Sequence, residues 1–405
     1  MTRNSLRRPA IANRPFRAAW MASAALALGV CGDASPAGAQ AFDPGRSDIA
    51  DFVAGMSERH GFEPGALATL LSQAESRPSI LQAIAKPAEK TLTWPEYRAR
   101  FLVDRRINRG AAVYAERRTE LERAQQATGV PADIVLAIVG VETFFGENTG
   151  RFRVVDALAT LAFDYPPRAP FFRGELEQFL LMTREEKLDP RSPLGSYAGA
   201  MGIPQFMPSS FRRWAVDGDA DGARDLWQDW ADVFASVGNY LQAHGWEAGQ
   251  PVMVSAAADG ADLAGLEFGK IGLPETVESL RRRGVRFETT LPPATPATLV
   301  ALPTGSGNEY RVGFANFHAI TRYNRSHLYA STVSDLADAI AAARLAPLTG
   351  VGAPSRPAAK PAPPTQAVPP APAVASSSWS STTATPSSPS PPASPAPAAT
   401  PESNP

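Results

Sequence analysis

The chain has 405 residues, of which 44% are hydrophobic and 20% are charged, and its formal net charge is −1. This apolar content is enough for a large core, and the balanced charge argues against nucleic acid as a partner. Cys31 is the only cysteine, which excludes intramolecular disulfides and metal clusters built from cysteines.

The N-terminus has the pattern of an export signal. Several arginines precede an apolar stretch over residues 18–30, which is too short to span a membrane as a helix, and small residues follow up to Ala39. We therefore predict a signal peptide over residues 1–39 and a periplasmic protein; a short hydrophobic N-terminal helix is the alternative. Cys31 stands where a lipoprotein carries its acylated cysteine, but Val30 before it is not small. Anchoring to the outer membrane through Cys31 is thus the second possibility, after a soluble form.

The region from residue 48 to 346 is predicted to be one globular, mainly helical body. Amphipathic, charge-patterned or apolar runs predict helices at 48–61, 64–72, 94–127, 131–140, 157–161, 173–183, 208–215, 230–244 and 333–343. Short strand-like pieces at 251–254, 285–288 and 297–302 are broken by Gly and Pro. The predicted fold class is therefore α+β, mainly α, with a small β element inserted at about 250–312.

Glu142 is the candidate catalytic residue. It ends the apolar run PADIVLAIVGVE, where the sequence turns aromatic and glycine-rich in TFFGENTG. A carboxyl group delivered by a buried helix to the edge of an aromatic pocket is desolvated, which should raise its pKa toward the range useful for proton donation. We expect Glu142 to act as a general acid.

The segment GSYAGAMGIPQFMPSSF, residues 195–211, combines small and aromatic residues. The small residues let the backbone approach a ligand closely, while Tyr197, Gln205, Phe206 and Met207 offer stacking and hydrogen-bonding surface. This composition suits a groove that binds a polymer. It equally suits a glycine-rich turn packed on a helix that starts at Pro208.

The segment DGDADGARDLWQ, residues 217–228, has the spacing of an EF-hand loop. Its candidate ligands are Asp217, Asp219, Asp221 and Asp225, at positions 1, 3, 5 and 9, with a glycine at position 6. Position 12, which normally supplies a bidentate carboxylate, is Gln228. The segment is thus either a structural Ca²⁺ site or a solvated acidic loop, and no cofactor is expected for the chemistry.

Two further segments complete the sequence. FANFHAITRYNRS, residues 314–326, contains Tyr323 and Asn324, which could bond sugar hydroxyl or acetamido groups or could belong to a partly buried loop. Residues 347–405 are mostly Pro, Ala, Ser and Thr, with too little apolar surface to offset the entropy of ordering. We predict a disordered tail there.

Residues from about 48 to 343 resemble the membrane-bound lytic transglycosylase B family, of the soluble-lytic-transglycosylase type. The resemblance rests on long motifs in the right order: IVGVETFFGENTGRFRVVDALATLAFDYPPRAPFFRGELEQFLLM, GSYAGAMGIPQFMPSSF, the aspartate loop, VGNYLQAHGW and ITRYN. It implies a lysozyme-like catalytic core, peptidoglycan glycan strands as substrate, and a calcium site at the aspartate loop. Within the resemblance, Glu142 matches the single catalytic acid/base. The positions matching substrate-binding residues are Tyr97, Ser196, Tyr197, Gln205, Met207, Tyr240, Tyr323 and Asn324.

The implied reaction is non-hydrolytic cleavage of the bond between N-acetylmuramic acid and N-acetylglucosamine, which leaves 1,6-anhydromuramic ends. One carboxyl group suffices there, whereas ordinary glycosidases use two. The residues leave two alternatives open. One is a lysozyme-like hydrolase, in which a second carboxylate activates water; the candidates are Asp156, Asp164, Glu175 and Glu177. The other is a peptidoglycan-binding protein without catalysis.

Overall fold

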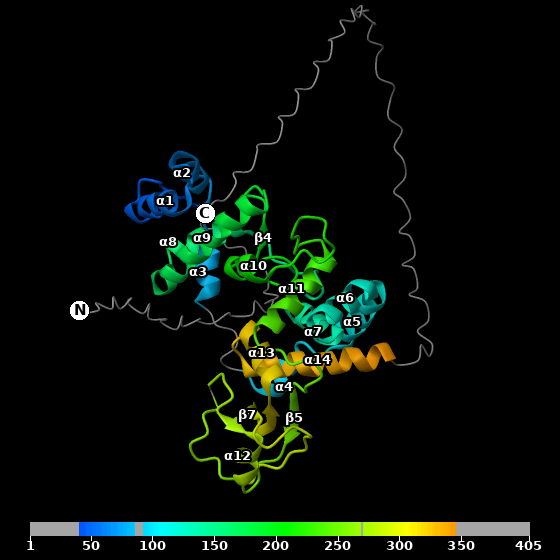
Figure 1. The fold of residues 1–405 in the computed structure, drawn as a ribbon. Helices are drawn as coiled ribbons and strands as arrows, with labels where there is room; N and C mark the ends of the chain where they lie inside the picture. The colour runs from blue at the N-terminus through cyan, green and yellow to red at the C-terminus, as the bar shows by residue number, and fades with distance from the viewer. Residues whose placement is uncertain (1–39, 86–91, 269, 346–405) are drawn as a thin grey trace, which may run out of the picture. The chain divides into compact units, whose positions relative to one another are not determined.

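The computed structural model describes residues 40–85, 92–268 and 270–345 (Figure 1). The predicted signal peptide, Cys31 and the predicted tail lie outside these residues. Within them the chain is mainly helical, with one four-stranded sheet and two pairs of very short strands. The predicted fold class is confirmed.

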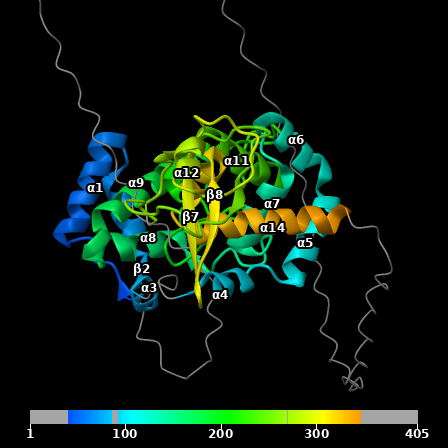
Figure 2. The same ribbon diagram turned by 90° about the horizontal axis from the view of Figure 1, so that it is seen from below.

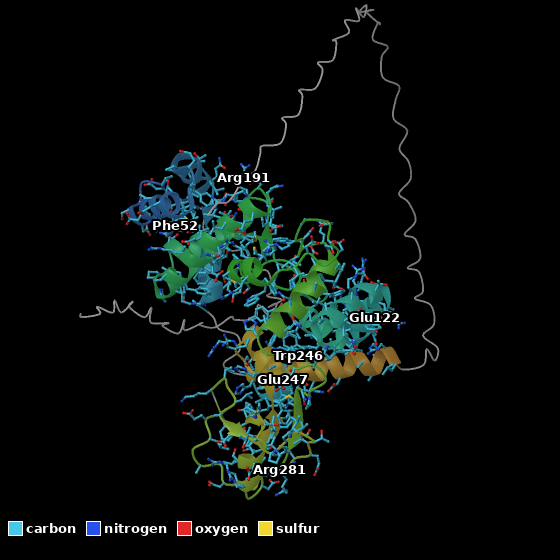
Figure 3. The ribbon with its side chains drawn as sticks, viewed as in Figure 1. Phe52, Glu122, Arg191, Trp246, Glu247 and Arg281 are labelled. Carbon is cyan, nitrogen blue, oxygen red and sulfur yellow. The ribbon has the colours of Figure 1, made fainter. Side chains whose placement is uncertain are left out.

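Three helices open the described chain: α1 (Ser47–His60), α2 (Pro64–Ser72) and α3 (Pro78–Ile84). The buried face of α1 includes Ile49, Phe52 and Met56, as its amphipathic spacing predicts. Phe52, labelled in Figure 3, meets the ring of Phe163 edge-on at 5.8 Å. The short strands β1 (Gln40–Ala41) and β2 (Glu75–Ser76) pair antiparallel beside these helices.

The charge-rich segment predicted as one helix over 94–127 forms three helices. These are α4 (Trp94–Ala99), α5 (Asp104–Glu116) and α6 (Arg118–Thr128). The breaks occur because the buried faces have different neighbours: α5 packs on α7 (Ala132–Thr143) and α14 (His327–Leu345), whereas α6 packs mainly on α11 (Trp230–Ala243). A pattern of surface charges does not reveal such a change of direction.

Helix α7 (Ala132–Thr143) forms the centre of the core and is buried along nearly its whole length. It packs against α5, α6, α11 (Trp230–Ala243) and α14 (His327–Leu345). Helices α8 (Val154–Phe163), α9 (Ala169–Glu185) and α10 (Pro208–Trp214) follow it, and the short strands β3 (Phe152–Arg153) and β4 (Leu194–Gly195) pair beside α8. No single helix in the described residues is long and apolar enough to span a membrane; α6 and α7 together pass that test but are bent by 112°.

The inserted sheet has the strand order β5-β8-β7-β6, with all neighbours antiparallel. Figure 2 shows its hairpin β7–β8. Its strands are β5 (Met253–Ala256), β6 (Glu275–Thr276), β7 (Pro296–Thr304) and β8 (Gly307–Gly313), and α12 (Val277–Arg282) packs on it. The sheet has its own hydrophobic cluster, which includes Leu280, Phe287 and Val312. The predicted strand at 285–288 is wrong, because only Arg286 makes a bridge there.

Polar contacts join the sheet to the helical body. The Trp94 indole of α4 donates to Glu309 of β8 at 3.1 Å, and Arg311 of β8 pairs with Asp335 of α14. Asp335 also pairs with Arg98 of α4 at 2.6 Å.

The connection from α11 into the sheet is fixed as well. It passes through Trp246 and Glu247 (Figure 3), where the fully buried Asn316 of α13 (Ala315–Tyr323) donates to the Glu247 carbonyl at 2.9 Å and accepts from its N–H at 2.7 Å. The start of the sheet is therefore held at a fixed place on the helical body.

Candidate active site

Glu142 lies in the last turn of α7 and is half-buried. The helix ends at once, because Phe144 and Phe145 both adopt left-handed backbone conformations, with φ of 54° and 57°. Such conformations are unfavourable for bulky residues and persist only where the surroundings impose them, typically at functional sites. One anchor is Thr143, whose hydroxyl donates to the Ile203 carbonyl at 2.8 Å. The end of α7 is thus tied to the loop that precedes α10.

Tyr329 of α14 is the direct partner of Glu142. Its hydroxyl donates to Glu142 Oε1 at 2.7 Å, and its side chain is fully buried. Burial and the neighbouring charge of Glu142 raise the pKa of Tyr329 well above its usual value, so this phenol keeps its proton and remains a donor. The sequence-based prediction does not include Tyr329. The sequence offers one weak indication of Tyr329: a tyrosine in a helix of small residues is expected to be buried, and its buried hydroxyl then needs a hydrogen-bond partner.

An aromatic cluster lines one side of the site. Tyr323 of α13 and Tyr240 of α11 meet edge-on at 4.9 Å, and Phe206 contacts both rings. The hydroxyls donate to backbone carbonyls, Tyr323 to Pro204 at 2.5 Å and Tyr240 to Arg322 at 2.6 Å. Burial, and next the charge of Glu142, raise the pKa of Tyr323 well above its usual value, which places this ring within the electrostatic reach of Glu142.

The loop from β4 to α10 is shaped by its own side chains. Ser196 Oγ accepts from the N–H groups of Ala198 and Ala200 at 3.2 and 3.1 Å. Gln205 has a left-handed φ of 54°, and its Nε2 donates to the carbonyls of Thr149 and Gly202 at 3.0 and 2.8 Å. Both polar side chains are buried; Ser196 fixes the shape of the loop, and Gln205 also holds it against the segment that follows Glu142.

The glycines of this loop are required by close backbone approach. A Cβ on Gly202, whose φ is 68°, would lie 2.4 Å from the Leu226 carbonyl oxygen, closer than real Cβ contacts. Glycine avoids this clash and adopts the positive φ without strain. The segment is therefore a glycine-rich turn before α10 that lies against the end of the helix carrying Glu142. Its part in binding a polymer stays a prediction.

The predicted substrate-binding residues are mostly buried. Tyr240 and Tyr323 belong to the aromatic cluster, and Ser196, Gln205 and Met207 to the loop. Tyr97 of α4 packs on Phe101 at 5.2 Å. Of the eight, only Tyr197 is more than one tenth exposed. Most of them are thus buried parts of the fold, and their contact with a substrate stays a prediction.

The other carboxylates considered for catalysis are engaged elsewhere. Arg153 holds Asp156 through two bonds of 2.9 and 2.8 Å, and Arg46 holds Asp164 at 2.7 Å. Arg59 and His60 hold Glu177 at 2.6 and 3.0 Å. The buried Glu175 accepts from the N–H and hydroxyl of Ser209 at 3.0 and 2.7 Å, an arrangement that ties α9 to the start of α10. Each of the four therefore has a structural role.

Burial raises the pKa of Glu175 above its ordinary value of 4.5 despite the two bonds from Ser209. The folded state therefore holds this proton more tightly than the unfolded chain, so the free energy of unfolding of the parent falls as pH rises from about 4.5. Glu175→Gln removes this loss. As pH rises above about 4.5, the free energy of unfolding of the variant, measured by urea unfolding, should therefore increase relative to that of the parent.

Glu177→Gln is the matched control with the opposite sign. Despite partial burial, the bonds from His60 and Arg59 hold the pKa of Glu177 below its usual value. This variant loses stability relative to the parent as pH rises toward about 4.5, in the range below that of Glu175. Parallel pH profiles for both variants would contradict these assignments.

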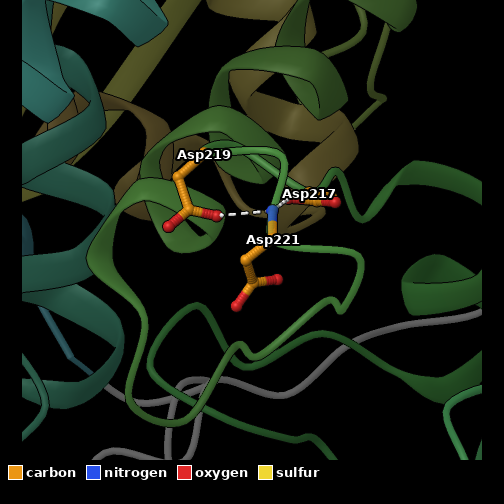
Figure 4. Close-up of side chains that lie close together, drawn as sticks. All are labelled: Asp217, Asp219 and Asp221. Atoms are coloured by element: carbon orange, nitrogen blue, oxygen red, sulfur yellow. Dashed lines mark hydrogen bonds between the residues drawn. The ribbon is translucent and has the colours of Figure 1, made fainter.

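The aspartate loop gathers three carboxylates. Ligand oxygens of Asp217, Asp219 and Asp221 lie within 4.8 Å of one another (Figure 4), and Gly222 takes the predicted sharp turn with φ of 95°. Asp225 is not part of this group, because its Oδ1 accepts from two backbone N–H groups that follow it. Three oxygen donors on a tight turn fit a hard cation such as Ca²⁺.

Asp232 of α11 is an acidic residue of this loop that the sequence-based prediction omits. It is 2% exposed, and its oxygens accept from the N–H groups of Gly218 and Asp225, each at 2.6 Å. Burial, and then the charges of Asp229 and Asp217, raise its pKa to about 6. The EF-hand pattern covers only the twelve residues 217–228, and Asp232 lies beyond it, in the first turn of α11.

A sequence model of the transglycosylase SLT domain matches residues 45–338. The chain belongs to this family. A curated relative in the family, membrane-bound lytic murein transglycosylase B of Escherichia coli K12, is 40% identical over 303 residues, or 73% of this chain and 82% of that protein. The predicted family is therefore confirmed.

Solved structures of lytic transglycosylases share the fold. The structure of catenated SltB1 from Pseudomonas aeruginosa matches with a TM-score of 0.69 and 46% identity, covering 74% of this chain and 99% of that one. Slt35 of Escherichia coli, solved in complex with calcium, matches with a TM-score of 0.68 and 39% identity, covering 76% and 96%. This transglycosylase SLT domain thus has the lysozyme-like, mainly helical fold predicted for it.

Proposed function

We propose that this enzyme is a lytic transglycosylase that cleaves the β-1,4 bond between N-acetylmuramic acid and N-acetylglucosamine in peptidoglycan, with Glu142 as its only acid/base. Membership of a family of lytic murein transglycosylases supports the enzyme class and the substrate. The observation that carries the assignment of Glu142 is its place at the end of a buried helix, with Tyr329 donating to Oε1 at 2.7 Å. The bond to Tyr329 orients the carboxyl group.

The reaction then needs two proton transfers and no water. Glu142 donates its proton to the glycosidic oxygen, the C1–O bond breaks, and N-acetylglucosamine leaves with a free hydroxyl group. The acetamido oxygen of the muramic residue stabilises the positive C1. Glu142, now a carboxylate, takes the proton of the C6 hydroxyl as O6 bonds to C1, which closes the 1,6-anhydro ring. The engagement of Asp156, Asp164, Glu175 and Glu177 in structural contacts favours this route over one with a second catalytic carboxylate.

The buried aromatic cluster supports attack on C1 by the C6 hydroxyl rather than by water. Tyr240, Tyr323 and Phe206 pack without exposing polar groups, because both hydroxyls are bonded to backbone carbonyls. Apolar walls of this kind exclude water from the reacting centre. The C6 hydroxyl of the substrate is then the acceptor within reach of C1.

The products test the proposed reaction directly. Purified peptidoglycan digested by the parent is expected to yield disaccharide fragments one water lighter than the hydrolytic product, in mass analysis. Reducing N-acetylmuramic ends would instead indicate a hydrolase. Binding to peptidoglycan with no released fragment would indicate a protein without catalysis.

The aspartate loop is proposed as a structural calcium site. Asp217, Asp219 and Asp221 would supply ligands, and Asp232 adds a buried carboxylate whose like-charged neighbours a cation would neutralise. The calcium complex of the relative Slt35 supports this assignment. The ion would fasten the loop to α11 and would take no part in proton transfer.

Calcium is therefore expected to raise the melting temperature. At a Ca²⁺ concentration of 100 times Kd, binding to the folded state alone adds about 2.7 kcal/mol to the free energy of unfolding. Asp219→Asn should abolish this shift in calorimetry, whereas Asp259→Asn, which changes an exposed aspartate of the sheet insertion, should preserve it. An equal shift in both variants would argue against the site.

The place of action is proposed from the sequence and the relatives. Removal of residues 1–39 would release the body into the periplasm with Gln40 at its N-terminus. The relative named membrane-bound supports instead an anchored form, which here would begin at Cys31. The two forms differ in the N-terminal residue of the mature chain.

A further inference from the structure

Two arginines of α5 lie against the segment that follows Glu142. The guanidinium of Arg106 is held between two rings, 4.8 Å from the centroid of Phe144 and 5.1 Å from that of Phe101. Arg105 lies over the same Phe144 ring at 4.6 Å. Phe144 is two residues beyond Glu142, so a positive charge is fixed against the segment that follows the proposed acid/base.

Arg106 has no carboxylate partner among the described residues. Its Nη1 donates to the carbonyls of Arg100 and Phe101 at 2.7 and 2.9 Å, and its Nε has no hydrogen-bond partner within the described chain. Arg105, by contrast, pairs with Glu147 at 2.6 Å. Burial, and next the charge of Arg105, lower the pKa of Arg106 to about 10, so it is still a cation at neutral pH. An uncompensated, partly desolvated cation attracts an anion more strongly than a solvated one.

Helix stability does not account for these arginines. Both lie in the first turn of α5, where the helix dipole favours negative side chains, and the N-cap residue Val103 makes no side-chain cap. A cation in this turn destabilises the helix rather than stabilising it. The helix dipole adds to the attraction for an anion.

A second series of contacts leads from Arg106 to Tyr329, the hydrogen-bond partner of Glu142. Phe101, which it covers, packs on Tyr97 at 5.2 Å. Tyr97 in turn lies within the electrostatic reach of Tyr329, the hydrogen-bond partner of Glu142. Arg106 thus contacts the segment after Glu142 directly, and two aromatic side chains separate it from Tyr329.

We propose that Arg106 binds a carboxylate on the muramic side of the substrate and so sets a preference for charged strands. This rests on the proposed function. The sugar rings of peptidoglycan are neutral, and its carboxylates belong to the stem peptides or, in strands without peptide, to the lactyl groups. Both sources offer the same chemistry, and the permanent charge of a guanidinium attracts either.

The test compares kcat/KM on three soluble glycan substrates, measured by release of anhydro products. The first carries native stem peptides, the second carries the same peptides with carboxylates converted to amides, and the third lacks peptide and has free lactyl carboxylates. The parent should prefer the first over the second by about fivefold, the size expected for one partly exposed charged contact. Because the lactyl carboxyl group is amide-bonded in both peptide-bearing substrates, a preference for the first over the second identifies the stem-peptide carboxylates. A third substrate as good as the first shows that the lactyl carboxylate is bound as well, and one as poor as the second restricts binding to the stem peptide.

Arg106→Gln should reduce this ratio to about one, with the rate on amidated strands within about twofold of the parent. Arg106→Lys keeps the charge and should retain part of the ratio. The control Arg109→Gln changes an arginine of the same helix that pairs with Glu116 at 2.8 Å, and it should leave the ratio unchanged. Added salt should reduce the ratio of the parent but not that of Arg106→Gln.

Two outcomes would overturn the inference alone: an unchanged ratio in Arg106→Gln, or an equal fall on both substrates with the ratio intact, which would indicate a purely structural role. A parent that releases no anhydro product from any of the three strands would instead contradict the proposed function.

Discussion

Glu142→Gln is expected to reduce kcat for release of anhydro products by about a thousandfold, within the usual range for a lost general acid or base. Glutamine has nearly the same shape and can still accept the hydrogen bond from Tyr329, so the site should keep its geometry. The amide cannot donate a proton to the glycosidic oxygen or take one from the C6 hydroxyl. Both steps of the proposed mechanism lose their catalyst at once.

Binding and a matched variant separate catalysis from folding. Glu142→Gln should still sediment with purified peptidoglycan, and its melting temperature should stay close to that of the parent. Glu177→Gln, at a carboxylate that pairs with Arg59 on another helix, should keep nearly full activity. Undiminished wall-lytic activity in Glu142→Gln would reject Glu142 as the acid/base.

Tyr329→Phe should have the next largest effect, a fall in kcat of roughly ten- to a hundredfold, because a misoriented proton donor loses efficient transfer. The ring remains in place, but Glu142 Oε1 loses the donor at 2.7 Å. That donor favours the ionised carboxylate, so without it the activity should persist to higher pH. A pH–rate profile of parent and variant measures both effects and also checks the raised pKa predicted for Glu142 from the sequence.

A second tyrosine provides the control. Tyr310→Phe in β8 removes a hydroxyl that meets only Asn308, at 3.4 Å, within the sheet insertion, and should leave the profile unchanged. If Tyr329→Phe has the kcat and the pH profile of the parent, the hydrogen bond to Glu142 has no catalytic importance.

Local patterns in the sequence predicted much of the fold, and they failed where tertiary neighbours decide. Helix α2 occupies the predicted residues 64–72, because its apolar periodicity and its N-terminal proline are local signals. Residues 315–323 were assigned no regular structure, yet they form α13, whose buried Phe317 and Ile320 have helical spacing. Strand β8 was not predicted either, because its Gly, Asn, Glu and Arg are poor strand formers; its pairing with β5 and β7 prevails over propensity.

The site shows the same division. Glu142 could be chosen because its helix and its aromatic neighbours are adjacent in the chain. Tyr329 could not, because it lies 187 residues further on and reaches Glu142 only through the packing of α14 on α7. Asp232 was missed for a related reason, since its contact with the aspartate loop depends on where α11 begins. Pairs made by packing leave no local pattern.

The pairing register of the hairpin β7–β8 determines where the chain can tolerate insertions. Side chains alternate between the two faces of a strand, so Glu309 and Arg311 face α4 and α14 while Val312 faces the sheet's own cluster. A slip of one residue in this pairing would exchange the faces and release the two helices that carry Tyr97 and Tyr329. Single-residue insertions within β8 should therefore impair catalysis from a distance, whereas insertions at the Gly305–Ser306 turn should be accepted.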